Sequence, residues 1–311
     1  MKTIYLSYFL LFLGILISPL YIFASGNPQP ADFILLLFAF LVLSSVWLRK
    51  KPFFKGYVPL VWPLLVVWIF TVCYAWSFFY QSPDFFKNAL FWIYNLIVST
   101  AFIHVLMSGE KGKRLVAHAV VSGLIVSGVG LLIGLGTGIR VTGFFNNPNQ
   151  LAYYSLCGLA LLLVLYNFEI KLRPFKIAAV LSGIGGIFAS ASLAAMAGLF
   201  CLGGAYLLAN LTKARRILLL TMMTVVLSLS AYSLDQYLGG HVSYNVEKRL
   251  QRLDRKVENI YEERKYDRMT TFPEYMILGA GEGHLERFYP HDGGEIHSSF
   301  GILLFAYGIP G

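Results

Sequence analysis

One apolar stretch decides how this chain folds: Phe175–Leu211, with the sequence FKIAAVLSGIGGIFASASLAAMAGLFCLGGAYLLANL. A helix needs about 20 apolar residues to cross the hydrocarbon core of a bilayer. The stretch is therefore too long for a single span. We expect it to form two spans, and we place the turn between them at Ser190-Ala191-Ser192, where small polar residues interrupt the apolar run.

The rest of the chain has the same apolar character. Of its 311 residues, 57% are hydrophobic, 16% are aromatic and only 13% are charged, whereas soluble domains carry roughly 25% charged residues. The mean hydropathy is +0.65. This composition excludes a soluble enzyme, a secreted disulfide scaffold and a disordered chain, and it predicts an all-α, polytopic membrane protein.

Apolar runs of about 17–23 residues predict nine transmembrane helices within residues 1–234. Their ranges are roughly 4–24, 31–48, 58–80, 88–108, 114–135, 151–167, 175–190, 193–211 and 216–234. The first run is too long for the apolar core of a signal peptide, and eight further runs follow it. We therefore expect it to remain as a span.

Lysine and arginine residues set the predicted orientation of these helices. The amino terminus and alternate loops hold fourteen of them, while the opposite short loops hold only Lys87 and Arg140. Because cytoplasmic loops are enriched in Lys and Arg, the amino terminus should be cytoplasmic and the long segment 235–297 periplasmic. The net charge of +9 then belongs to the cytoplasmic rim, so nucleic-acid binding is not expected.

The predicted spans contain few ionisable residues. Asp32 lies at the start of a span, and His104 and His118 lie near cytoplasmic ends. Ion-coupled transporters need ionisable groups at mid-membrane depth, so this pattern argues against a transporter. The last apolar run, 298–311, is too short to cross a bilayer. We interpret it as the start of a further membrane segment, and we expect a natural carboxyl-terminal part to follow it.

The segment 235–297 carries most of the polar groups that could do chemistry. Apolar residues at helical spacing over 246–268 predict an amphipathic helix that lies on the membrane surface or on other spans. Arg264 and Arg268 are four residues apart and share one helical face. Two guanidinium groups held together suit a phosphate ligand. The alternative is a pair of solvated arginines balanced by neighbouring acidic side chains.

Two other features of this segment have weaker signals. Gly279-Ala280-Gly281-Glu282-Gly283 is glycine-rich, but it lacks the Lys-Ser/Thr of a phosphate loop, so a flexible turn is the simpler interpretation. Four of the six histidines lie here, at spacings that match no zinc motif. The three cysteines lie in apolar runs and form no CxxC pair. We therefore expect no metal, no disulfide framework and no cofactor.

Two short motifs remain. Asn147 and Pro148, within Arg140–Gln150, are typical of a helix N-cap and first helical residue, but this leaves Arg140, the only charge in its loop, unexplained. His297-Ser298 is followed by nine residues and then by Gly308-Ile-Pro-Gly. A histidine at this position is either an interfacial residue or a general base for a hydroxyl group.

Together these motifs resemble the bacterial O-antigen ligase superfamily, which also includes O-antigen and exopolysaccharide polymerases. Three features match in order and topology: the motif Gly143–Asn149 before a span, the Leu278-Gly-Ala-Gly-Glu-Gly sequence in a long periplasmic loop, and the pattern His-[Asn/Ser/Gln]-x9-Gly-x-x-[Gly/Thr/Tyr] from His297. The resemblance covers about residues 140–311, whereas the earlier spans agree only in number and topology.

The resemblance implies a GT-C-like helical bundle in the bacterial inner membrane, with its active site facing the periplasm. Such enzymes transfer a glycan from undecaprenyl diphosphate to an acceptor hydroxyl, such as that of lipid A-core, with inversion and without a metal. Carried over, His297 would activate the acceptor, and Arg264 and Arg268 would hold the diphosphate. Substrate-binding roles would fall to the following residues: Arg140, Asn147, Asn149, Gly279, Gly281, Ser298 and Gly308.

The chain departs from the family pattern in two respects. Many members have Ser-Arg where this chain has Ser192-Leu193, and they usually have about twelve spans. Three alternatives to a ligase remain: a repeat-unit polymerase, a protein O-oligosaccharyltransferase and a non-enzymatic lipid or polysaccharide flippase. The flippase should have a charged path through its spans, which this sequence lacks.

Overall fold

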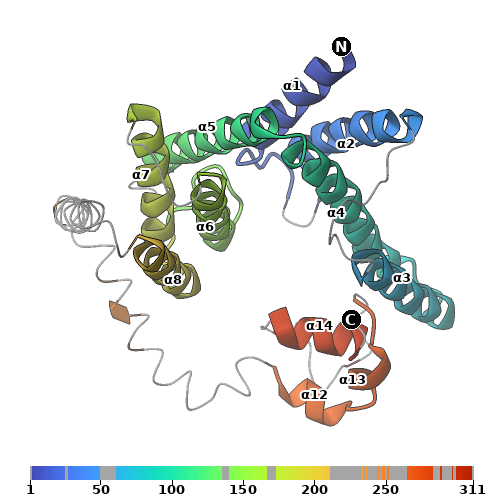
Figure 1. Ribbon diagram of the computed structural model, residues 1–311. Helices are drawn as coiled ribbons and strands as arrows, with labels where there is room; N and C mark the ends of the chain where they lie inside the picture. Colours follow the sequence, from blue (N-terminus) through green and yellow to red (C-terminus); the bar gives the residue numbers. More distant parts are fainter. Residues whose placement is uncertain are drawn as a thin grey trace. The chain divides into compact units, whose positions relative to one another are not determined.

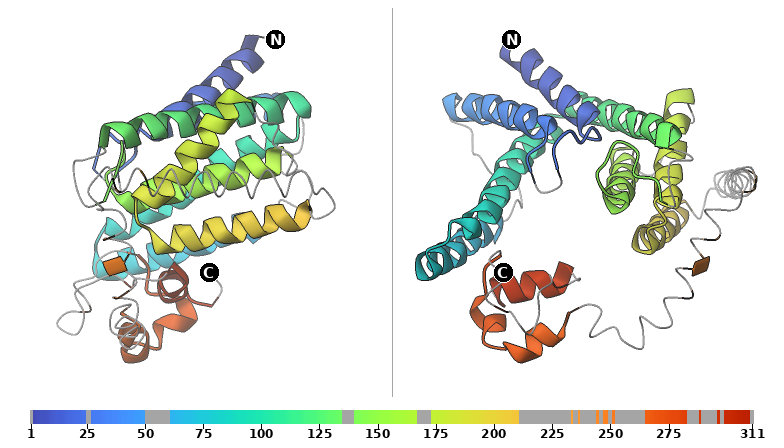
Figure 2. Two further views of the ribbon diagram at one scale, coloured as in Figure 1. Left: turned by 90° about the vertical axis from the view of Figure 1, so that its left-hand side faces the viewer. Right: turned by 180° about the vertical axis from the view of Figure 1, so that it is seen from behind.

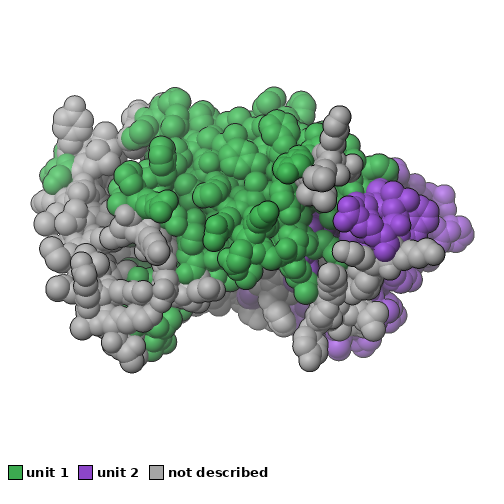
Figure 3. Space-filling model, turned by 45° about the horizontal axis from the view of Figure 1, so that its top comes forward, with its two compact units in different colours: residues 1–42, 104–249 green, residues 43–103, 250–311 purple. Residues whose placement is uncertain are grey.

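We describe a computed structural model of the chain. It describes residues 2–24, 27–49, 61–134, 140–166, 173–210, 265–282 and 299–309, together with isolated positions between 233 and 296. In these ranges every regular element is a helix, which confirms the predicted all-α class. The chain forms two compact units, residues 1–42 with 104–249 and residues 43–103 with 250–311, coloured separately in Figure 3.

Six described helices are long and apolar enough to cross a membrane. They are Pro30–Leu48, Pro63–Tyr80, Ala89–Leu106, Glu110–Gly134, Pro148–Leu165 and Leu193–Asn210. Two apolar helices, Tyr5–Ile17 and Pro174–Ala189, are shorter. The chain is therefore a multi-pass membrane protein by the length and composition of its helices. The predicted ninth span, 216–234, and most of the predicted surface helix over 246–268 lie outside the described residues.

The first unit is built around α5 (Glu110–Gly134), which packs against α1 (Lys2–Ile17), α6 (Pro148–Leu165) and α7 (Pro174–Ala189) (Figure 1). Helix α8 (Leu193–Ala209) packs against α6 and α7. The boundary between the two units falls within helix α2 (Pro30–Leu48), after Val42.

Small residues bring these helices close together. A Cβ atom on Gly186 of α7 would lie 2.6 Å from Ser155 Oγ of α6, and one on Gly183 would lie 2.9 Å from Leu159. Close approach through small residues is the usual way that helices associate in lipid, because apolar side chains gain little by exchanging contacts with lipid tails for contacts with protein.

The helix break that decides the fold is confirmed. Helix α7 ends at Ala189 and α8 begins at Leu193, and Ala191 between them adopts a φ of 50°. Helix α1, in contrast, ends at Ile17 rather than near the predicted residue 24. Pro19 explains the difference, because a proline disfavours helical geometry in the residue before it.

The second unit contains α3 (Val61–Tyr80), α4 (Asp84–Leu106) and three short helices from the end of the chain. These are α12 (Asp267–Thr271), α13 (Tyr275–Leu278) and α14 (Ser299–Tyr307), which lie together in both views of Figure 2. Helix α14 contacts both α13 and α3. The end of the chain is thus packed onto a helix more than two hundred residues earlier in the sequence.

Candidate functional site

The structure brings two of the sequence motifs into direct contact within the second unit. The backbone N–H groups of Ala280 and Gly281 donate hydrogen bonds to the carbonyl oxygens of Phe305 and Ala306, at 2.8 and 2.7 Å. Ile309 N donates in turn to Met276 O at 3.0 Å. The glycine-rich turn is therefore paired through its backbone with the end of α14.

Glycine is required at this junction for steric reasons. Gly279 and Gly308 have φ values of 89° and 72°, where residues with a side chain are strained. A Cβ atom on Gly279 would lie 2.5 Å from Ala306 O, and one on Gly308 would lie 2.8 Å from Gly279 N. The glycines of the two motifs thus allow their backbones to touch.

Three tryptophan side chains hold the junction to the membrane helices. Trp76 Nε1 on α3 donates to Gly279 O at 2.9 Å, and Trp68 Nε1 donates to Tyr307 O at 2.7 Å. Trp92 Nε1 on α4 donates to the Tyr307 hydroxyl at 3.0 Å. Buried indole N–H groups need an acceptor, and here each of these three is satisfied by the junction.

Tyr307 is the centre of this network. Its side chain is fully buried among Ile69, Cys73, Phe85 and Ala89. Its hydroxyl also donates a hydrogen bond to the carboxylate of Glu282, the acidic residue of the glycine-rich motif. The network therefore joins α3, α4, the glycine-rich turn and α14 through polar groups in an apolar surrounding.

The sequence interpretation missed Tyr307, Glu282 and the tryptophans as a group. The signal that could have drawn attention to them is the presence of indole N–H groups in spans that offer few side-chain acceptors. The acceptors proved to be backbone carbonyls and one hydroxyl near the end of the chain, which sequence spacing cannot predict.

Arg268 is the best defined of the predicted phosphate-binding residues. It lies on α12 and is only 2% exposed. Its guanidinium carbon lies 4.9 Å from the centroid of the Phe288 ring, a cation–π geometry. Phe288 belongs to an apolar cluster with Ala280, Ile296 and Phe305. The structure therefore buries the Arg268 guanidinium against the apolar cluster that contains Ala280 of the glycine-rich turn.

The other two members of the predicted catalytic group, His297 and Arg264, lie outside the described residues, as does Ser298. Ile296, the residue before His297, is 3% exposed and packs in the same cluster as Phe288. Among the described positions no group of three side chains could hold a metal ion.

A second cluster of predicted residues lies in the first unit. Arg140 Nε donates to Ser190 O at 2.8 Å, and Arg140 Nη2 donates to Asn149 Oδ1 at 2.9 Å. Val141 N donates to Ala189 O at 3.2 Å. Arg140 thereby joins its own loop to the turn between α7 and α8, which gives the charge left unexplained by the sequence a structural role.

The remaining motif residues fasten this loop to further segments. Asn147 is the N-cap of α6, as predicted, and its side chain accepts a hydrogen bond from Asn149 N at 2.8 Å. Asn146 Nδ2 donates to Phe23 O at 2.7 Å, and Tyr21 N donates to Phe144 O at 3.1 Å. Three turns of the first unit, around residues 21, 145 and 190, are thus held together by this motif.

No protein-family model, curated protein or solved structure matches this chain. The two clusters must therefore be interpreted from their own chemistry.

Proposed function

We propose that the protein is a membrane glycosyltransferase of the O-antigen ligase type. It would take a glycan from undecaprenyl diphosphate and transfer it to an acceptor hydroxyl of lipid A-core or a similar glycan. By the charge-derived orientation, the reaction would occur at the periplasmic face of the bacterial inner membrane. Two kinds of evidence support this function: the resemblance of the sequence motifs, and the chemistry of the side chains in the second unit.

The observation that carries the proposal is the burial of Arg268 beside the glycine-rich turn. A planar guanidinium binds the oxygens of a phosphate or diphosphate ester in pairs, so Arg268 is suited to hold the diphosphate of the donor. Ile296 shares the cluster that Arg268 covers, and His297 follows Ile296 in the chain.

In the proposed reaction, His297 accepts the proton of the acceptor hydroxyl, whose oxygen attacks the anomeric carbon of the glycan. The bond between that carbon and the diphosphate oxygen breaks, and the electron pair leaves with undecaprenyl diphosphate. Arg268 stabilises the charge that develops on this leaving group, an electrostatic role that can dominate catalysis. Arg264 is proposed as its partner, and Arg140 as a residue that supports the loops of the first unit.

The test uses the native organism with the full reading frame deleted. Its undecaprenyl-linked glycans are extracted and sized by mass spectrometry, with a strain complemented by the wild-type frame as the control. Long glycans that accumulate on the carrier indicate a ligase or a transferase to protein. Accumulated single repeat units indicate a polymerase, the second candidate. An unchanged lipid-linked pool contradicts the proposal.

Complementation with His297→Ala and with Arg268→Lys assigns the chemistry. The histidine variant should restore no transfer while reaching the membrane in normal amount. The lysine variant should be reduced at least tenfold, because a point charge replaces a planar group that binds oxygens in pairs. Full activity of either variant would remove that residue from the proposed mechanism.

A further inference from the structure

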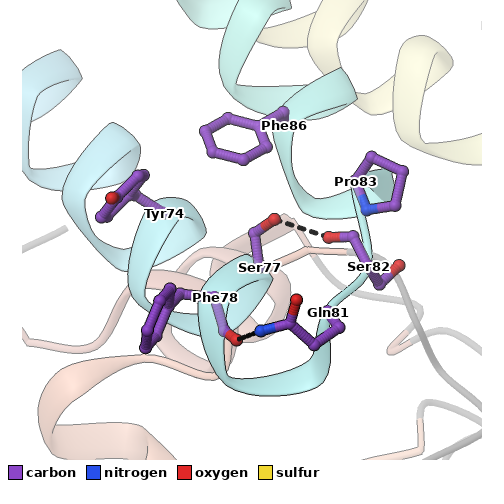
Figure 4. A pocket seen from close by; sticks show the side chains of 7 residues that line it. All are labelled: Tyr74, Ser77, Phe78, Gln81, Ser82, Pro83 and Phe86. Carbon is purple, nitrogen blue, oxygen red and sulfur yellow. Dashed lines mark hydrogen bonds between the residues drawn. The ribbon is translucent and has the colours of Figure 1, made fainter.

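A hollow of about 340 Å³ lies where α3 turns into α4 (Figure 4). Three aromatic rings line it, those of Tyr74, Phe78 and Phe86, together with three neutral polar side chains, those of Ser77, Gln81 and Ser82. Ligand sites commonly have volumes of about 300–1,000 Å³ and combine apolar walls with a few polar groups. The size and the lining of this hollow both fall within that description.

Hydrogen bonds fix the shape of the hollow before any ligand binds. Ser77 Oγ donates to Ser82 O at 2.6 Å, and Ser82 N donates to Ser77 O at 3.2 Å. Gln81 Nε2 donates to Phe78 O at 2.6 Å, and Gln81 has a φ of 53°. A residue with a side chain adopts this conformation only where its surroundings hold it. The amide of Gln81 is thus held at the hollow by the turn itself.

The chemistry of the lining selects one class of ligand. None of the seven lining side chains is charged at neutral pH, so the described part of the lining offers no cation to a phosphate group. Hydroxyl and amide groups offer hydrogen bonds that an acyl chain cannot use. Sugar rings present hydroxyl groups at their edges and polarised C–H groups on their faces, and the electron-rich faces of aromatic rings attract such C–H groups.

We infer that this hollow is a subsite for a neutral sugar of the glycan. The inference rests on the proposed function, which it deepens. Trp76, one residue before Ser77, donates to Gly279 O, so the hollow and the glycine-rich turn are attached to the same turn of α3. The subsite would bind the glycan beyond the sugar that reacts, while Arg268 binds the diphosphate.

The test measures sugar binding directly. The full chain is placed in phospholipid nanodiscs and titrated with oligosaccharides cut from the native cell's surface polysaccharide by mild acid, which carry neither lipid nor diphosphate. Saturation-transfer NMR reports binding to the wild type, and Phe78→Ala should raise the Kd at least tenfold. Gln81→Gly should also weaken binding, because glycine keeps the φ of the turn and removes the amide together with its two methylene groups.

Phe79→Ala is the matched control. Phe79 is the next residue, it is 75% exposed where Phe78 is 71% exposed, and it does not line the hollow. Both variants remove a phenyl ring of similar exposure from the end of α3, but only Phe78→Ala should change the Kd. Equal effects of the two variants, or no binding to the wild type, would overturn the inference in favour of an ordinary aromatic belt.

Repeating the titration with His297→Ala separates the two proposals. If this variant still binds the sugar, and deletion of the gene leaves the lipid-linked pool of the cell unchanged, the subsite stands and the proposed transferase activity is contradicted. If transfer depends on His297 but is unaltered by Phe78→Ala, the transferase activity stands and the sugar subsite is contradicted.

Discussion

The two motif regions of this molecule are held in place by different kinds of contact. In the first unit, the loop around Arg140 and Asn147 is tied to its neighbours by side-chain hydrogen bonds, and both Asn147 and Asn149 are exposed. In the second unit, Gly279 and Gly308 meet through their backbones, and both are buried, as is Tyr307. The first region depends on which side chains are present, whereas the second also requires that Gly279 and Gly308 have none.

This difference predicts how well each region should tolerate substitutions. A side-chain hydrogen bond at an exposed loop is in competition with water, so its loss costs little. A backbone contact with no free space has no substitute, because any Cβ atom must displace the main chain. Substitutions in the second region should therefore lower stability and activity more than substitutions in the first.

Gly279→Ala should have the largest effect. The new Cβ atom would lie 2.5 Å from Ala306 O and 2.6 Å from Tyr307, and alanine is strained at a φ of 89°. We expect a loss of stability of about 3 kcal/mol or more and a loss of transfer of at least a hundredfold. Thermal unfolding in detergent, followed by tryptophan fluorescence, measures the first, and complementation of the deletion strain measures the second.

Gly203→Ala is its control, because a Cβ atom on that glycine of α8 meets nothing within 4 Å. This variant should unfold at or slightly above the wild-type temperature, since alanine favours helix. If both alanine variants behaved alike, the contact between the two glycine motifs would not be what makes Gly279 necessary.

Tyr307→Phe should have the next largest effect. Removing the hydroxyl leaves the Trp92 N–H without its acceptor and the Glu282 carboxylate without this donor. A buried polar group that loses its partner costs about 1–3 kcal/mol, so the unfolding temperature should fall by several degrees. Tyr5→Phe, at a tyrosine that is 71% exposed, should leave it unchanged. A fall of equal size in both variants would contradict the role given to the network.

These two regions also separate what sequence can predict from what it cannot. The turn at Ser190-Ala191-Ser192 and the N-cap at Asn147 were predictable, because each follows from residues within a few positions of one another. The end of α1 at Ile17 differs from the predicted boundary near residue 24, because the apolar run continues past the point where Pro19 ends the helix. The pairing of Gly279 with Gly308, and the three indole donors around Tyr307, join residues far apart in the chain. Such contacts come from tertiary packing, which periodicity and spacing do not encode.

Arg140→Lys tests the stronger contact of the first region. A single ammonium group lacks the fork that lets Arg140 reach Ser190 O and Asn149 Oδ1 together. We expect a loss of about 1–2 kcal/mol and a decrease in transfer of severalfold at most. In the double variant with Asn149→Ala the two losses should be less than additive, because they remove one shared hydrogen bond. A loss of transfer as complete as that of His297→Ala would instead place Arg140 in the reaction itself.

Asn147→Ala should have the smallest effect. The N-cap side chain satisfies one backbone donor, Asn149 N at 2.8 Å, at the start of α6, and replacing such a cap by alanine costs about 1 kcal/mol. Asn147→Asp should restore the stability, because aspartate caps helices as well as asparagine does. Transfer should stay near the wild-type level in both variants if Asn147 only begins the helix. If Asn147→Asp unfolds normally but loses transfer, the amide itself contacts the substrate, and the first region would share in binding rather than only support it.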